Sequence, residues 1–147
     1  MIGGETPTTM KANADGTFGA ASGSIEGRPK DREKFKAFTV YFDFDRSVIK
    51  SSEASKVDSV AGQFKNENPA CDLLIEGHCD ERGTAEYNRA LGERRALAIR
   101  EYLIRAGVNG EKIHTVSFGK DQPVALGHDE ASWAKNRRGE FILVLPK

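Results

Sequence analysis

Ionisable side chains crowd one short stretch of this chain, between an apolar run and a helical one. They are His78, Asp80, Glu81 and Arg82, followed further along by Arg94 and Arg95. Such groups suit a ligand that carries both charges. Its ammonium can bind a carboxylate, and its carboxylate can bind an arginine through two parallel hydrogen bonds. The stretch therefore predicts a site for a zwitterion.

The neighbouring elements have to position these groups. Asp72 to His78 is predicted to be a strand, and Thr84 is predicted to cap a helix that runs to about Arg105 and ends at Gly107. Phe38 to Phe44 is rich in aromatic and β-branched residues and predicts an earlier strand. If these two strands lie side by side with matching ends, the charged residues at their ends meet at one edge: Asp45, Asp80, Arg82 and Arg95.

Helical geometry predicts which residues of the second helix face the sheet. At ~100° per residue, the core-facing stripe holds Tyr87, Leu91, Ala98 and Tyr102, with Arg95 at its edge. The opposite face, expected to be solvated, carries Arg89, Glu93 and Arg100. An arginine on the core side needs an anion, because an unpaired buried charge costs several kcal/mol. Asp80 is the obvious partner, and such a pair is also common as a purely structural clip.

The remaining pattern alternates strands with helices. A helix capped by Ser51 or Ser52 is expected to end near Asn66. A strand at Lys112–Phe118, a short helix at Asp129–Asn136 and a strand at Arg138–Leu145 follow. This order predicts an α/β (α+β) sandwich: a β-α-β-α-β core with an additional C-terminal strand and helices on one face of a mixed sheet.

Composition narrows the function further. Residues 1–27 are rich in Gly, Ala, Ser and Thr and are expected to form a flexible tether before a domain spanning residues 28–147. The formal net charge is zero, which argues against nucleic acid as a partner. The sequence has no apolar run near the ~20 residues that span a bilayer.

The two cysteines are expected to be free thiols. Cys71 and Cys79 bracket a predicted strand, which would hold them roughly 26 Å apart. A disulfide needs Cα atoms within ~7 Å.

An enzyme is the main competing class. The sequence has no GxSxG, HExxH or glycine-rich phosphate loop. The run His78-Cys79-Asp80-Glu81 has no metal-ligand spacing, because a strand turns alternate residues to opposite faces. We therefore expect no catalysis, no cofactor and no metal.

Several ordered motifs together resemble one family. IEGHCDERGTAEYNRALGERRA at Ile75–Ala96, VYFDFD at Val40–Asp45, FGKDQPVALGHDE, and the closing NRR at Asn136–Arg138 are similar to the OmpA-like peptidoglycan-binding domains, in particular those of the peptidoglycan-associated lipoproteins. The resemblance covers about Phe38 to Leu145. Cys79 departs from it, standing where Thr is usual, and so do Gly139 and Glu140, where apolar residues are more usual.

The resemblance implies non-covalent binding of the diaminopimelate in the peptidoglycan stem peptide, which links the outer membrane to the cell wall. Asp80 would take the ammonium and Arg95 the carboxylate, while the other pocket-lining positions would be Phe44, Asp45, Arg82 and Leu91. It also implies periplasmic Tol proteins as partners and a periplasmic location. Attachment to the outer membrane would be through a lipid on an N-terminal cysteine of a native precursor, because Met1 stands here. The alternative is a Tol-interaction module with little wall binding.

Overall fold

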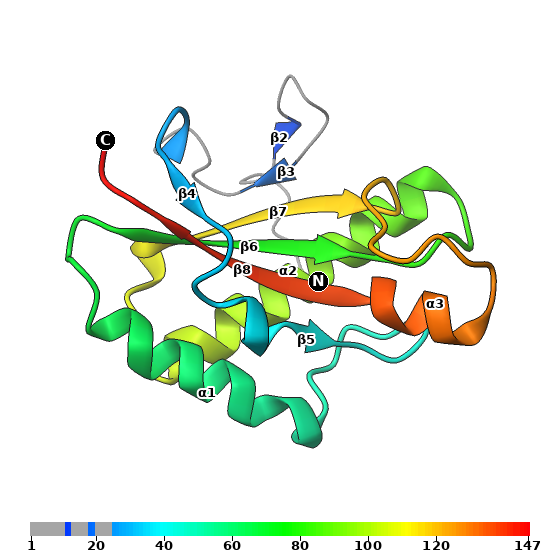
Figure 1. Cartoon of the computed structure of the whole chain (residues 1–147), viewed down its shortest axis with the longest axis horizontal. Helices are drawn as coiled ribbons and strands as arrows, with labels where there is room; N and C mark the ends of the chain where they lie inside the picture. Colours follow the sequence, from blue (N-terminus) through cyan, green and yellow to red (C-terminus); the bar gives the residue numbers. More distant parts are fainter. Residues whose placement is uncertain (1–10, 13–17, 20–24) are drawn as a thin grey trace.

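A computed structural model describes residues 11–12, 18–19 and 25–147 of the chain (Figure 1). The predicted tether, residues 1–27, falls mostly outside these residues. In chain order the elements are β2 (Lys11–Ala12), β3 (Phe18–Gly19), β4 (Lys30–Asp31), η3 (Lys36–Phe38), β5 (Val40–Tyr41), α1 (Ser51–Lys65), β6 (Asp72–His78), α2 (Ala85–Arg105), η4 (Gly110–Lys112), β7 (Ile113–Gly119), α3 (Glu130–Asn136) and β8 (Arg138–Val144).

A mixed five-stranded sheet forms the centre of the fold and confirms the predicted class. The strand order is β4-β8-β6-β7, and β5 also pairs with β8. β6 runs parallel to β7 and antiparallel to β8. The first predicted strand does not lie beside the second: Val40 of β5 and Gly77 of β6 flank Gly139 of β8 from opposite sides.

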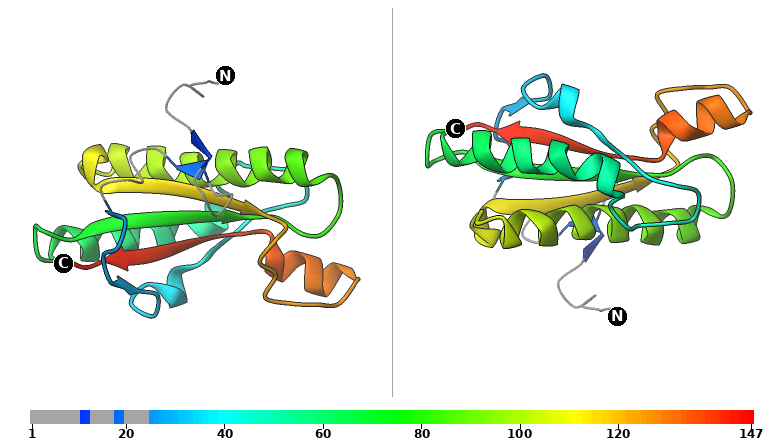
Figure 2. Two further views of the ribbon diagram at one scale, coloured as in Figure 1. Left: turned by 90° about the horizontal axis from the view of Figure 1, so that it is seen from above. Right: turned by 90° about the horizontal axis from the view of Figure 1, so that it is seen from below.

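Apolar side chains divide between the two faces of the sheet. The larger cluster joins β6 and β8 to α1 and α2, with Leu73, Ile75 and Phe141 packed against residues such as Val60 and Ile99. The smaller cluster lies on the other face, where Ile25 covers apolar residues of β6, β7 and β8. Figure 2 shows α2 running along β6 and β7. No helix in the described part of the chain is long and apolar enough to cross a membrane.

The first strand is much shorter than predicted. Only Val40 and Tyr41 pair with β8. After them, the Phe42 amide donates to the Arg137 carbonyl, and the chain leaves the sheet in a turn in which Asp45 has a φ of 59°. Phe44, which the aromatic pattern had placed in the strand, lies in this turn with its side chain exposed.

The start of α1 also differs from the prediction. Lys50 is the N-cap residue, and no side chain caps this end. Glu53 of the first turn accepts a hydrogen bond from the Tyr41 amide at 2.8 Å and so ties the helix to β5. The serines are already inside the helix.

Helix α2 is held directly on β6 by two glycines. Its start is the predicted one: the Thr84 hydroxyl accepts from the Tyr87 amide at 3.0 Å. A Cβ atom added to Gly77 of β6 would lie 1.8 Å from the carbonyl oxygen of Gly92 in α2. The two backbones can approach this closely only because neither residue has a side chain.

This contact sets a different core-facing stripe from the predicted one. The buried residues of α2 are Asn88, Leu91, Gly92, Arg95, Ala96, Ile99 and Leu103. Tyr87 is 46% exposed, and Ala98 and Tyr102 are only partly buried. The predicted solvated face was also wrong, because Arg89, Glu93 and Arg100 are half-buried beside β7. Arg89 and Glu93 form hydrogen bonds with Ser117 and Thr115 of β7, and Arg89 also binds Asp121. Arg100 donates to the carbonyls of Ile113 and Gly110.

Candidate binding site

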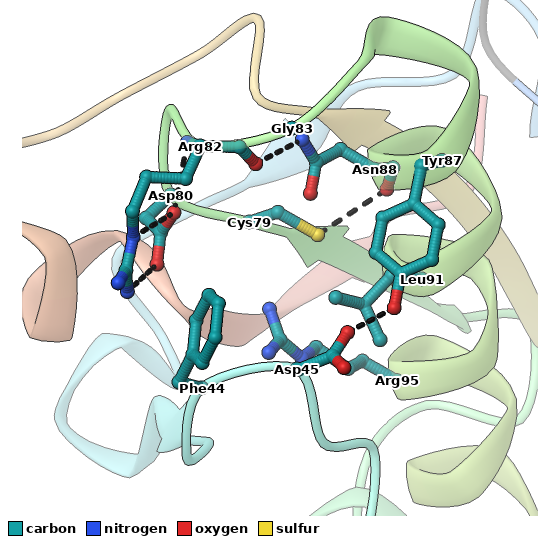
Figure 3. Close-up of a pocket in the computed structure, with 10 residues that line it drawn as sticks. All are labelled: Phe44, Asp45, Cys79, Asp80, Arg82, Gly83, Tyr87, Asn88, Leu91 and Arg95. Carbon is teal, nitrogen blue, oxygen red and sulfur yellow. Dashed lines mark hydrogen bonds and ion pairs between the residues drawn. The ribbon is translucent and has the colours of Figure 1, made fainter.

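A pocket of about 240 Å³ opens where β6 ends and α2 begins (Figure 3). The turn after β5 closes its other side. All six residues predicted for the site line this pocket: Phe44, Asp45, Asp80, Arg82, Leu91 and Arg95. Cys79, Gly83, Tyr87 and Asn88 complete the lining.

Arg95 is wholly buried and is held by main-chain oxygens. Its Nε donates to the Arg46 carbonyl at 2.8 Å, Nη1 to the His78 carbonyl at 2.9 Å and Nη2 to the Asp43 carbonyl at 3.1 Å. A guanidinium has five N–H donors. These three bonds use one N–H on each nitrogen, and the Cys79 side chain also hydrogen-bonds with the guanidinium.

The predicted pairing of Arg95 with Asp80 was wrong. No carboxylate of the described chain forms an ion pair with Arg95. Three main-chain carbonyls bind the guanidinium instead: those of Asp43 and Arg46 in the turn and that of His78 at the end of β6. Burial disfavours its charged form and lowers the pKa of Arg95 from its ordinary value, while Asp80 and Asp45 nearby act in the opposite direction.

Asp80 is paired instead with the residue two positions on. Arg82 grips it through two side-chain bonds, Nε to Oδ1 at 3.2 Å and Nη2 to Oδ2 at 2.9 Å, and its amide donates to Oδ1 at 3.0 Å. The Nη1 of Arg137 lies 3.6 Å from Oδ2. Burial would raise the pKa of Asp80, but the bonds from Arg82 and the charge of Arg137 outweigh it and hold the pKa below its usual value.

Aromatic rings fix the position of Arg82. Its guanidinium carbon lies 3.9 Å from the centroid of the Phe44 ring and 4.0 Å from that of Trp133 in α3. The Trp133 indole in turn donates to Glu81 at 2.8 Å. A cation between two rings loses little freedom when a ligand arrives, so this side of the pocket is preorganised.

Asp45 faces the pocket from the turn. Figure 3 shows its carboxylate against the Tyr87 hydroxyl, which donates to it. Asp45 is the one described non-glycine residue with a positive φ. Such a conformation is strained by roughly 1–3 kcal/mol and is concentrated at functional positions.

Several lining residues were not predicted. Tyr87 was expected to face the sheet, and Asn88 was placed only beside that stripe. The side-chain amide of Asn88 donates to the Arg82 carbonyl at 2.7 Å, and the main-chain carbonyl of Asn88 accepts from the Cys79 thiol at 3.2 Å. Arg137 was quoted only as part of the NRR motif, yet its side chain joins the Phe42 carbonyl, Glu130 and Asp80 behind the pocket. Its position after a helix end gave no signal of that role.

Two residues of the predicted charged cluster lie away from the pocket. The His78 ring stacks on Phe118 with centroids 5.5 Å apart and contacts Glu76 on the other face of the sheet. Glu81 binds Trp133 and His128. Glu76, His78 and Glu140 form the one group in the described chain spaced to hold a metal, but Arg32 and Arg138 already bind its two carboxylates.

Both cysteines are free, as predicted, and both are buried. Burial raises the pKa of the Cys79 thiol to about 11, although the nearby charge of Arg95 acts in the opposite direction. Cys79 therefore forms part of the pocket wall as a neutral thiol.

Comparison with known proteins agrees with this fold. Residues 41–137 match the OmpA family. A peptidoglycan-associated lipoprotein of Pseudomonas aeruginosa is 46% identical over 125 residues, which are 84% of this chain and 73% of that protein. One from Rhizobium meliloti is 36% identical over 97% of this chain and 81% of its own length.

Solved structures of similar proteins have the same fold. The peptidoglycan-associated lipoprotein of Burkholderia pseudomallei superposes with a TM-score of 0.68 and 47% identity, over 71% of this chain and 88% of that one. The C-terminal domain of Helicobacter pylori MotB reaches the same TM-score at 18% identity, over 74% and 85% of the two chains, which is a likeness of fold alone.

The fold and the pocket define an OmpA-like domain, a class of structural binding domains rather than enzymes. Within that class, the chain belongs to the family of peptidoglycan-associated lipoproteins.

Proposed function

We propose that this chain binds peptidoglycan without covalent chemistry, through the free amino-acid end of diaminopimelate in the stem peptide. The carboxylate of that end would bind Arg95, and its ammonium would lie between Asp80 and Asp45. The methylene groups would contact Phe44 and Leu91. The relatives named for peptidoglycan support the polymer as the partner, and the pocket chemistry supports the zwitterion.

One observation carries the proposal: a fully buried guanidinium lines the pocket, and no carboxylate of the described chain forms an ion pair with it. Purely structural buried charges are normally paired. A ligand carboxylate would supply the anionic partner of the Arg95 guanidinium.

The affinity for a single ligand should be moderate. A charge-assisted hydrogen bond contributes roughly 1.5–3 kcal/mol. The ammonium must also share Asp80 with Arg82, which already binds both of its oxygens. Many sites on one wall and a tethered domain would raise the overall strength through effective concentration.

We also propose, on family membership alone, that the protein works in the periplasm, links the outer membrane to the wall and contacts Tol proteins.

The test is co-sedimentation with purified sacculi that contain diaminopimelate, with free diaminopimelate as the competitor. Asp80→Asn keeps the shape and removes the charge. Arg95→Lys keeps a cation and removes the two-pronged donor set. Arg105→Ala, an exposed arginine of the same helix, is the matched control.

We expect wild type and Arg105→Ala to pellet and to be released by diaminopimelate. Asp80→Asn and Arg95→Lys should stay in the supernatant while melting cooperatively. Binding is scored per folded protein, because Arg95 also holds the turn. If Asp80→Asn binds like wild type, or diaminopimelate releases nothing, the pocket is not the wall site.

A further inference from the structure

A second hollow of about 470 Å³ lies against the proposed pocket. Asp43, Phe44, Arg46, Val48 and Lys50 line it. Phe44 belongs to both linings, so the two spaces share one wall. Apart from Phe44, the outer hollow shares no lining residue with the zwitterion site.

The shared wall is a turn whose position depends on Arg95. The Arg46 amide donates to the Asp43 carbonyl at 3.2 Å and closes the turn. Arg95 then holds both ends, donating to the carbonyl of Asp43 and to that of Arg46. The outer hollow is thereby fixed relative to the inner pocket.

The two spaces differ in charge. Two carboxylates face two guanidinium groups in the inner pocket. The outer hollow has two cations and one anion, and Lys50 already pairs with Asp43 at 3.0 Å. The exposed side chain of Arg46 has no hydrogen bond or ion pair within the described residues. One positive charge therefore remains, beside the exposed apolar surfaces of Phe44 and Val48.

We propose that the outer hollow is a second subsite, which binds a carboxylate on the stem-peptide residue adjacent to diaminopimelate, with Arg46 as the recognising group. This inference rests on the proposed function of the inner pocket. Only the free end of diaminopimelate would occupy the inner pocket, so the peptide to which it is joined must continue outside it. The neighbouring residues of such a stem carry carboxylates: the α-carboxylate of γ-linked D-glutamate on one side, or the terminal carboxylate of D-alanine on the other.

Isothermal titration with three synthetic ligands tests the proposal. They are free diaminopimelate, the tripeptide L-alanyl-γ-D-glutamyl-diaminopimelate, and the same tripeptide with its D-glutamate α-carboxylate amidated. A diaminopimelyl-D-alanine dipeptide, with and without C-terminal amidation, tests the other source. The proteins are wild type, Arg46→Ala, Arg46→Lys and the control Arg105→Ala.

Wild type should bind one of the two carboxylate-bearing peptides about 5- to 10-fold more tightly than its amidated form, through one added charge-assisted contact. Arg46→Ala should reduce that ratio to about one while changing the affinity for free diaminopimelate less than 2-fold. Arg46→Lys should restore part of the ratio, and Arg105→Ala all of it.

The subsite is refuted if wild type binds free and amidated peptides equally, or if Arg46→Ala keeps the preference. The subsite is also refuted if Arg46→Ala loses affinity for free diaminopimelate and for the peptides by the same factor, because Arg46 would then act only by holding the turn. If wild type does not bind diaminopimelate at all, the proposed function fails and the subsite fails with it.

Discussion

Glu93 is a half-buried carboxyl group of α2 whose environment should make the stability of the fold depend on pH. It lies against β7, accepts from the Thr115 hydroxyl at 3.1 Å, and has a second carboxylate oxygen that is buried without a partner. Burial raises its pKa to about 7, with Thr115 opposing the shift. The folded protein therefore favours the neutral acid.

Stability should fall as pH rises from about 4.5 to about 7. Over this range the unfolded chain releases the Glu93 proton while the folded chain keeps it, and above pH 7 the loss is complete. The cost is on the order of 3 kcal/mol. Urea denaturation at pH 5 and pH 8 measures it. Glu93→Gln, which is never charged, should remove the difference and be the more stable protein at pH 8.

Ligand binding should not follow the same pH profile. The carboxyl group of Asp80 has a lowered pKa, because the bonds from Arg82 and the charge of Arg137 outweigh its burial. It therefore stays ionised well below neutral pH. Titration of diaminopimelate at pH 8, 7, 6 and 5 should give nearly constant affinity per folded protein. A loss of affinity centred near pH 6 would show that another group takes the ammonium.

At the scale of elements, the glycine contact between β6 and α2 positions the whole site. Gly77→Ala should destabilise the fold by more than about 3 kcal/mol, because its Cβ would overlap the Gly92 carbonyl. Gly62→Ala in α1 is the matched control, since nothing lies within 4 Å of its Cβ. It should stabilise the protein by roughly 0.5–1 kcal/mol through helix propensity. Thermal or urea unfolding distinguishes the two.

The same contact explains where sequence reasoning succeeded and failed. The bounds of β6 and the cap of α2 were predicted correctly, because a continuous apolar run and Thr84 are local signals. The buried stripe was predicted correctly at Leu91 and Arg95 and wrongly at Tyr87, Ala98 and Tyr102, because the helix docks through Gly92, which carries no hydrophobic signal. The partners of Arg95 were missed because a carbonyl of the main chain has no sequence signature. The six predicted residues still line one pocket, because their motifs rather than their predicted contacts selected them.

At the scale of the whole molecule, β4 and the pocket lie at opposite ends of the sheet. β4 pairs Lys30 with Val144, which also pairs with Asp72 at the start of β6. The pocket lies beyond His78, at the far end of the same strand. Figure 1 shows β6 and β8 running between these two ends of the sheet, so a force applied at β4 and at the pocket would act along the strands.

Arg28 is the residue that fastens the N-terminal end. Its side chain donates to the carbonyls of Leu145 and Ala70 at 3.0 and 2.7 Å, and it pairs with the nearly buried Asp72 at 3.4 Å. It thus joins the start of the domain to the C-terminal segment and to the loop before β6. His114 and Lys112 hold Asp72 from the other side, so part of the cluster survives without Arg28.

Arg28→Ala should lower the free energy of unfolding by about 2 kcal/mol, from the loss of several partly buried hydrogen bonds. Amide exchange should quicken in residues 25–32, while diaminopimelate affinity per folded protein stays within 2-fold of wild type. Arg105→Ala should change neither quantity. If Arg28→Ala weakened binding as strongly as Asp80→Asn, the two ends of the sheet would be coupled, and anchoring and wall recognition could not be treated as separate functions of this fold.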